Sequence, residues 1–128
     1  QFDGIEDSKG FIAEVDNLAT GDVDATLTPG GLFEIRGTGL KIAGDDEHLA
    51  EVGIFLEADD GSSRLQIDPT AIAVNEPKTL KAIAPDASAL PVGSKWYVEV
   101  RTQASAKSAS TLIKSVRIMK SDFTVTIL

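Results

Sequence analysis

Two glycine-containing turns bracket short alternating segments between residues 27 and 42, and this arrangement commits that part of the chain to β-structure. Pro29-Gly30 fixes one backbone angle at a turn value and then supplies a residue free to take positive φ, so the chain can reverse. From Leu32 to Arg36 apolar and polar residues alternate, as in a half-buried strand. Gly37-Thr38-Gly39 interrupts this alternation, which resumes from Leu40 to Ile42. We expect a bend here that lets the chain pass from one sheet to another.

Alternating segments recur along the rest of the chain, with turn residues about every 8 to 12 positions. Asp59-Asp60-Gly61 between two such segments predicts a hairpin, and residues 86–90 could form a single helical turn. No segment has a helical pattern long enough to cover a sheet. The sequence therefore predicts an all-β fold, a two-sheet antiparallel Ig-like β-sandwich of about 7–9 strands. The expected strands are residues 11–16, 32–36 continued after the bend by 40–42, 51–57, 65–67, 72–74, 80–83, 95–101, 111–118 and 122–127.

The segment after Gly93-Ser94 has the cleanest alternation and is predicted to be a central strand. Its apolar residues point one way and its polar residues, with Tyr97, point the other. Residues 103–110 are expected to form a polar loop after it. The chain has no cysteine, which excludes a disulfide-anchored sandwich but not the sandwich itself. The predicted core centres on Trp96, Val98, Ile54, Phe33, Ile35 and Phe123.

Length and composition predict one domain that requires no disulfide or metal site for stability. A chain of 128 residues can bury about two-thirds of its unfolded surface. We expect residues 11–128 to form the sandwich and residues 1–10 to be a linker or N-terminal arm. No apolar run approaches the roughly 20 residues of a membrane span, and no secretory signal is expected at the start of this sequence. The composition leaves the cellular compartment open.

The formal net charge of −8 is unevenly distributed. Residues 1–94 carry 18 acidic and 6 basic side chains, whereas residues 95–128 carry 2 acidic and 6 basic ones. Nonspecific nucleic-acid binding depends on Lys and Arg neutralising phosphates. Direct nucleic-acid binding is therefore not expected, and the basic residues of the C-terminal third are predicted to neutralise acidic neighbours within the fold.

Several segments, in their order and spacing, resemble a bacterial family of unknown function with an Ig-like fold, over roughly residues 11 to 128. Members of that family commonly lie C-terminal to an HU-like DNA-binding domain, so the resemblance implies a longer DNA-associated protein. The resemblance assigns no functional residue to this chain, and no segment of the chain matches the HU-like domain itself. A looser similarity exists to the Ig-like domains of plexins and transcription factors. The segments are Leu27-Thr28-Pro29-Gly30-Gly31, Ile35-Arg36-Gly37, residues 40–45, Val52-Gly53-Ile54-Phe55-Leu56, Asn75-Glu76-Pro77 and residues 98–103.

Three acidic segments could offer oxygen ligands to a cation, but each has a simpler interpretation. Asp45-Asp46-Glu47-His48 lacks the spacing of an EF-hand loop and is interpreted as a solvated loop. Asp59-Asp60-Gly61 is explained as a hairpin turn, and Asp22-Val23-Asp24 as a polar connection. Calcium binding is left open, and no metal, cofactor-binding or catalytic residue is assigned.

Enzymatic activity is not expected. His48 is the single histidine, and no nucleophile elbow accompanies it. Gly37-Thr38-Gly39 matches part of a dinucleotide fingerprint but lacks the third glycine and the following helix, so it is interpreted as a bend. Trp96 and Tyr97 could stack on a sugar, although Trp96 lies on the apolar face and is predicted to be core. Tyr97, on the opposite face, is the candidate for binding.

The leading hypothesis is a non-catalytic accessory or interaction module of a larger bacterial protein. Its partner would be another protein or an adjacent HU-like domain, which would place it in the cytoplasm with the nucleoid; no membrane partner is expected. The alternative is an extracytoplasmic glycan- or protein-binding adhesion module that uses loops such as residues 45–49 and 103–110. A hydrolase with His48 in a polar pocket is a third hypothesis.

Overall fold

The computed structural model describes residues 10–21, 25–106 and 111–128, and the described residues form a nearly all-β structure. Short 3₁₀ turns occur at Leu49–Glu51 and Pro69–Ala71. No helix in the described part of the chain is long and apolar enough to span a bilayer. The strands are β1 (Phe11–Asn17), β2 (Thr26–Leu27), β3 (Leu32–Thr38), β4 (Gly53–Ala58), β5 (Arg64–Gln66), β6 (Ile72–Asn75), β7 (Thr79–Ile83), β8 (Lys95–Ala104) and β9 (Leu112–Ile127).

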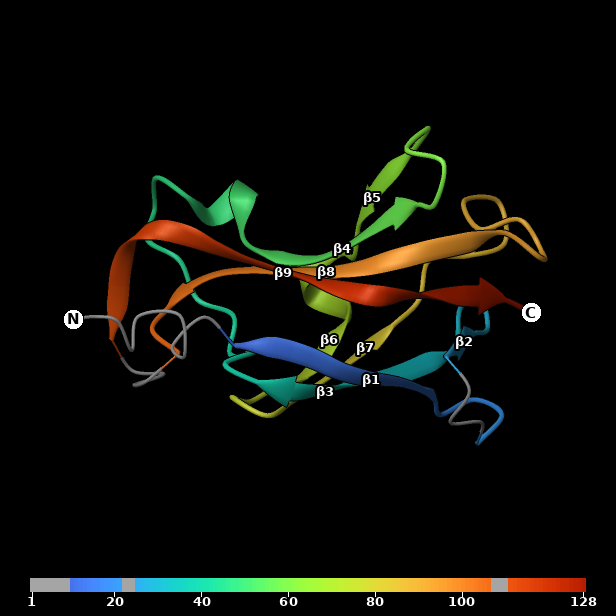
Figure 1. Cartoon of the computed structure of the whole chain (residues 1–128), viewed down its shortest axis with the longest axis horizontal. Helices are drawn as coiled ribbons and strands as arrows, with labels where there is room; N and C mark the ends of the chain where they lie inside the picture. Colours follow the sequence, from blue (N-terminus) through green and yellow to red (C-terminus); the bar gives the residue numbers. More distant parts are fainter. Residues whose placement is uncertain (1–9, 22–24, 107–110) are drawn as a thin grey trace.

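The strands form two sheets that face each other across the core (Figure 1). One sheet has the order β1-β3-β7-β6, and the other has the order β2-β9-β8-β4-β5. These orders correspond to strands A-B-E-D and G-F-C of an Ig domain, with β5 added beside β4. All pairs are antiparallel except β2 and β9, which run parallel through Thr26 opposite Thr126 and Leu27 opposite Ile127. The predicted two-sheet sandwich is confirmed.

The predicted core is largely confirmed. Trp96 is 4% exposed, and Phe33, Ile35, Ile54 and Val98 are buried with it between the two sheets. Phe123 is only half-buried and packs against this cluster from its margin. The predicted central strand is also confirmed, because β8 lies between β9 and β4 in the middle of the five-stranded sheet.

The connection from β3 to β4 differs from the prediction. The expected strand at residues 40–42 does not form; Asn75 instead binds both backbone groups of Ile42, through Oδ1 at 2.8 Å and Nδ2 at 2.9 Å. The next N–H, of Ala43, donates to Thr102 Oγ1 at 3.0 Å. Asn75 ends β6 and Thr102 belongs to β8, so this segment crosses between the sheets, as expected of the bend. Side chains replace the ladder hydrogen bonds that a strand would have made.

The C-terminal part of the chain is one strand where the sequence predicted two. β9 continues through the expected break because Ser121 bridges a bulge there: its Oγ accepts the N–H of Val98 at 3.0 Å and donates to the carbonyl of Phe123 at 2.7 Å. A second irregularity lies opposite Gln103, which was expected to begin a loop but is fully buried within β8. Its Nε2 donates to the carbonyls of Ile113 and Lys114, both at 3.1 Å.

Several strand boundaries also differ from the prediction by a few residues. Glu51 lies in a 3₁₀ turn rather than in β4, and β3 runs through Gly37 to Thr38 before ending at Gly39, whose φ is 68°. The predicted Pro29-Gly30 turn is confirmed, with Gly30 at φ 75° and the N–H of Gly31 donating to the carbonyl of Thr28 at 2.8 Å.

Candidate functional site

The outer face of the five-stranded sheet gathers charged and aromatic side chains from four strands. The register places Phe55 of β4 directly opposite Glu99 of β8, and Glu99 opposite Lys120 of β9. In the neighbouring row Glu57 lies between Tyr97 and Arg64 of β5. Because residues two apart on a strand share a face, Arg101 of β8 belongs to the same surface. We call Phe55, Glu57, Arg64, Tyr97, Glu99, Arg101 and Lys120 the arginine–aromatic face.

Glu99 is the organising residue of this face. Although ionisable, it is only 4% exposed. Its Oε1 accepts from Arg101 Nε at 2.6 Å and from Arg64 Nη2 at 3.2 Å. A buried carboxylate requires such partners, because desolvation without pairing costs several kcal/mol. Burial of Glu99 therefore fixes the positions of two arginines that come from different strands.

The ring of Phe55 packs against the same two guanidinium groups. The guanidinium carbon of Arg64 lies 4.4 Å from the centre of the Phe55 ring, and that of Arg101 lies 5.5 Å away. Both distances are within the range of cation–π attraction. The two arginines cover the ring, which is consequently only 7% exposed although it points away from the core. Both faces of β4 are therefore covered, Ile54 and Leu56 by the core and Phe55 by the arginines.

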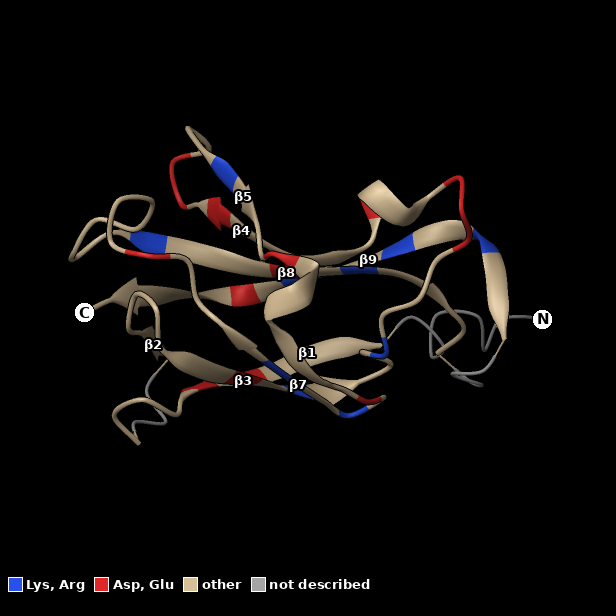
Figure 2. Cartoon of the chain, turned by 180° about the vertical axis from the view of Figure 1, so that it is seen from behind, with Lys and Arg blue, Asp and Glu red and all other residues tan. Residues whose placement is uncertain are grey.

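Tyr97 lies at the other side of the face with a cation over its ring. Lys120 Nζ is 4.6 Å from the ring centre and donates to Glu57 Oε1 at 3.1 Å. Arg101 and Lys120, both in the basic C-terminal third, thus pair with acidic residues, as the charge distribution predicted. Figure 2 shows a basic position on β5 beside an acidic position on β4. A shallow depression of about 260 Å³, lined by Phe55, Arg64, Leu65 and Gln66, adjoins this cluster.

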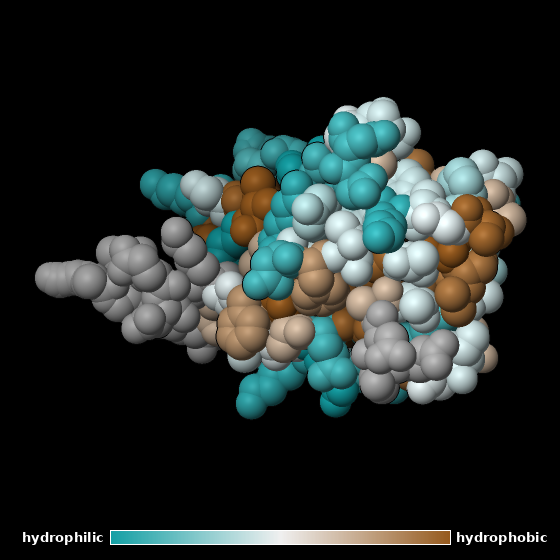
Figure 3. All heavy atoms as spheres, turned by 45° about the vertical axis from the view of Figure 1, so that its right-hand side comes forward, coloured by the Kyte–Doolittle hydropathy of each residue, from teal (hydrophilic) through white to brown (hydrophobic). Residues whose placement is uncertain are grey.

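Outside the arginine–aromatic face, the surface carries both hydrophobic and hydrophilic residues. In Figure 3, hydrophobic residues form separated groups surrounded by hydrophilic ones on the visible side. Exposed apolar side chains among the described residues include Ile118, 55% exposed, which lies opposite Arg101. Sequence periodicity correctly placed Tyr97, Glu99 and Arg101 together, but it could not show that Arg64 and Phe55 join them, because strand pairing decides that.

His48 and Asp45 meet in an exposed turn. His48 Nδ1 lies 2.6 Å from Asp45 Oδ1, and that oxygen also accepts the backbone N–H groups of Glu47 and His48, both at 3.1 Å. The hydrogen bond that His48 makes to Asp45 raises the pKa of His48 and lowers the pKa of Asp45. The Asp45 carboxylate is therefore occupied by its own turn, as expected for a solvated loop. The described residues include no group of three or more His, Cys, Asp or Glu side chains arranged to hold a metal ion.

The remaining candidates from the sequence have structural explanations or lie outside the described residues. Asp59-Asp60-Gly61 forms the predicted hairpin between β4 and β5, and Asp60 Oδ1 accepts the N–H of Ser62 at 2.8 Å. Asp22 and Asp24 are not within the described ranges. Gly37 allows β1 and β3 to approach closely, because a Cβ there would collide with the carbonyl oxygen of Phe11.

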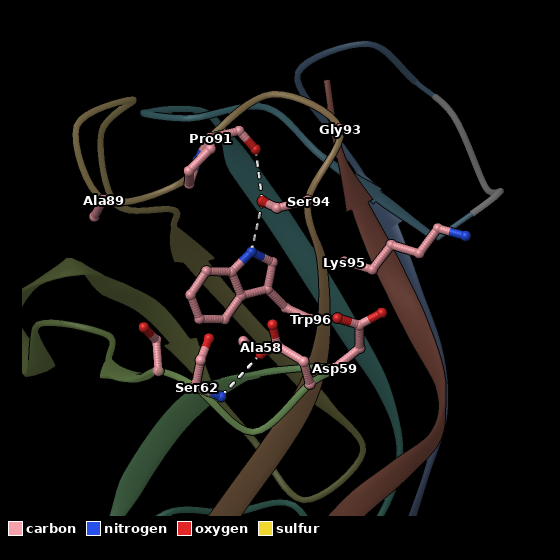
Figure 4. A pocket seen from close by; sticks show the side chains of 11 residues that line it. Ala58, Asp59, Ser62, Ala89, Pro91, Gly93, Ser94, Lys95 and Trp96 are labelled. Atoms are coloured by element: carbon pink, nitrogen blue, oxygen red, sulfur yellow. Dashed lines mark hydrogen bonds between the residues drawn. The ribbon is translucent and has the colours of Figure 1, made fainter.

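Trp96 forms the wall of a pocket of about 520 Å³ between the β4–β5 turn and residues 89–96 (Figure 4). Its indole Nε1 donates to Ser94 Oγ at 2.9 Å, and that hydroxyl donates to the carbonyl of Pro91 at 2.5 Å. With 4% exposure, the indole offers no free face to a sugar ring. The prediction that Trp96 is a core residue is confirmed.

The two loops of the adhesion hypothesis differ from each other. Residues 45–49 form an exposed turn, with Leu49 56% exposed. The segment 103–110 begins with a fully buried residue, Gln103, and residues 107–110 lie outside the described ranges. In its described part this segment offers less exposed polar surface than the sequence suggested.

Sequence comparison identifies the family. The model of a domain of unknown function with an Ig-like fold (DUF4469) matches residues 11–119. The chain belongs to this family. The resemblance inferred from the sequence is thereby confirmed, and the DUF4469 match covers the nine strands of the described residues except the second half of β9.

A solved structure from Bacteroides vulgatus ATCC 8482 has the same fold as this DUF4469 domain. The protein is named "putative bacterial DNA binding protein"; it is 27% identical and superposes with a TM-score of 0.78. The match covers 92% of the present chain but 47% of the other, so the chain spans about half the length of that protein. No curated protein matches the chain.

Proposed function

We propose that this domain is a non-catalytic interaction module of a longer bacterial protein that associates with DNA through another segment, such as an HU-like domain. The observation that carries the proposal is the match to half of the Bacteroides vulgatus protein, whose name refers to DNA binding. In that arrangement the other half would contact DNA, and the DUF4469 domain would contact a protein.

The charge of the domain supports this division of roles. A net charge of −8 opposes approach to a polyphosphate. The cations with described contacts are engaged within the fold: Arg36 pairs with Glu14 at 2.7 Å, Arg64 and Arg101 with Glu99, and Lys120 with Glu57. Arg117 donates to the carbonyls of Gly39 and Ala104.

The polar contacts of the turns support a role other than catalysis. Asp60, Asp68 and Asp86 each accept the N–H of the residue two positions further on, at 2.8, 2.9 and 3.1 Å. The hydroxyl of that same residue, followed by its backbone N–H, lowers the pKa of each carboxyl group, which keeps it charged and makes it a poor general acid near neutral pH. Such carboxylates stabilise turns, as Asx residues commonly do.

An electrophoretic mobility comparison tests the proposal. The isolated domain and the product of the complete reading frame are titrated against the same duplex DNA at physiological salt. We expect the complete protein to retard the duplex and the isolated domain to leave it free. Retardation by the isolated domain would refute the division of roles, and a complete protein that does not bind would refute the DNA association.

A further inference from the structure

Two guanidinium groups on the arginine–aromatic face are held in place before any ligand arrives. Arg64 and Arg101 share one oxygen of Glu99 and lie over the same Phe55 ring. Ordering a long side chain at an interface costs conformational entropy, and here the fold has already restricted both side chains. A ligand bound by these groups would meet a preorganised surface.

Both arginines retain unused donors. Arg101 binds Glu99 through Nε, which leaves its two terminal nitrogens without a hydrogen-bond acceptor in the described part of the chain. Arg64 uses only one terminal nitrogen. Their side chains are 26% and 42% exposed, so solvent and ligands can reach them. The terminal nitrogens of a guanidinium form a planar fork that matches the two oxygens of a carboxylate.

The surroundings of the fork suit a polypeptide. The depression lined by Phe55, Arg64, Leu65 and Gln66 lies on one side, and the exposed Ile118 lies opposite Arg101 on the other. Arg and aromatic residues are the types most enriched at protein interfaces and their energetic hot spots. Apolar contacts next to a carboxylate-binding fork would give a protein segment both affinity and register.

Charge complementarity indicates an acidic partner. Arg64, Arg101 and Lys120 exceed the two carboxylates of this face, Glu57 and Glu99, by one positive charge, whereas the whole chain carries −8. An acidic segment is repelled by most of the domain and finds paired, oriented guanidinium groups on this face. The interspersed carboxylates oppose a continuous row of phosphates more than they oppose a single well-placed carboxylate.

We propose that the arginine–aromatic face binds an acidic protein segment, with a carboxylate of that segment accepting hydrogen bonds from the terminal nitrogens of Arg101 and a donor of Arg64. This deepens the proposed function and rests on it: it names the surface and the chemistry of the partner. Glu99 and Phe55 are positioning residues, because they hold the two arginines in orientation.

An NMR titration of the isotope-labelled chain with hexaglutamate tests this proposal at low ionic strength. We expect saturable shifts of the Arg64 and Arg101 Nε–Hε signals and of backbone amides in β4, β5 and β8. Arg101→Gln should weaken binding about tenfold, since hydrogen bonds to a charged group are lost. Arg101→Lys keeps the charge without the fork and should also weaken binding, which separates geometry from net charge.

Matched variants control for folding and for overall charge. Lys81→Gln removes one positive charge from the opposite sheet and should leave binding unchanged. If Arg101→Gln unfolds the domain because Glu99 loses a partner, the more exposed Arg64→Gln gives the same comparison. Amide spectra of every variant report whether the fold is kept.

Three outcomes would overturn the proposal. They are the absence of saturable shifts, equal binding by the wild type, Arg101→Gln and Arg64→Gln, and shifts that spread over both sheets. Tighter binding at this face of a thymidine oligonucleotide with the same charge would show that nucleic acid, and not protein, is the ligand. The first three results are independent of the mobility comparison of isolated domain and complete protein, so the two proposals can fail separately.

Discussion

The side-chain oxygen of Gln103 accepts the backbone N–H of Asp45 at 2.8 Å, which ties a fully buried residue of β8 to the connection between the sheets. The amide nitrogen of Gln103 binds the carbonyls of Ile113 and Lys114 on the other side. One side chain thereby satisfies three backbone groups at two irregular segments. The buried amide takes the place of ladder hydrogen bonds that neither segment can make.

Gln103→Ala should destabilise the domain by about 2 to 4 kcal/mol, because it leaves several backbone groups without partners. Urea denaturation followed by tryptophan fluorescence measures this loss. Gln66→Ala is the matched control, because Gln66 is exposed on the edge strand β5 and makes one long bond, to the carbonyl of Val52 at 3.3 Å. Equal stability of the two variants would contradict the structural role given to Gln103.

Trp96→Ala should cost roughly 3 to 5 kcal/mol, the usual loss for a large aromatic residue removed from a core. Trp96→Phe should cost less, because it keeps most of the buried area and loses only the hydrogen bond to Ser94. Thermal unfolding of both variants by circular dichroism provides the comparison. An unchanged midpoint for Trp96→Ala would mean that the residue is not part of the core.

Asp16 should make stability depend on pH. It is 5% exposed, and its Oδ1 has no hydrogen-bond partner among the described residues. Burial, followed by the neighbouring Glu14, raises the pKa of Asp16. A raised folded pKa means that the stabilising contribution is fully present below the unfolded value, about 3.9, and is lost as pH rises through the folded pKa.

Asp16→Asn should therefore be more stable than the wild type at pH 7, and this advantage should shrink as pH falls through the folded pKa of Asp16. Denaturation midpoints at several pH values measure it. Asp122→Asn removes the same charge from an exposed site on β9 and should change little. The hydrogen bond from Arg36 lowers the pKa of Glu14, so the contribution of Glu14 to stability has the opposite pH dependence. The quantity to compare at each pH is therefore the difference in stability between Asp16→Asn and the wild type.

The Asp45–His48 pair should be visible by NMR titration of the imidazole. We expect the His48 pKa to lie above the ordinary value of about 6.5, and Asp45→Asn to return it toward that value. The raised His48 pKa implies stabilisation that is present below the unfolded value and lost as pH rises through the folded one. Because the pKa of Asp45 is lowered in the folded state, stability is also lost at low pH, as pH falls through the folded pKa of Asp45. An unshifted His48 in the wild type would argue against the pair.

Local patterns in the sequence determined most of the strands and the class of fold. Alternation placed Trp96 and Val98 in the core and Tyr97, Glu99 and Arg101 on the other face, because side chains of a strand alternate whatever its neighbours are. The Pro29-Gly30 turn and the Asp-Gly hairpin could be predicted for a similar reason, since the backbone geometry of a turn restricts its residues locally.

Tertiary structure alone decided the features that depend on partners distant in the sequence. Residues 40–42 alternate like a strand, yet Asn75 and Thr102 bind their backbone, and Ser121 carries β9 through a predicted break. The arginine–aromatic face likewise exists only because strand pairing brings Phe55 and Arg64 to Glu99, across 35 residues of sequence between Arg64 and Glu99. Hydrophobic alternation acts between neighbours along the chain, whereas buried polar groups take whichever partner the packed sheets bring within hydrogen-bond distance.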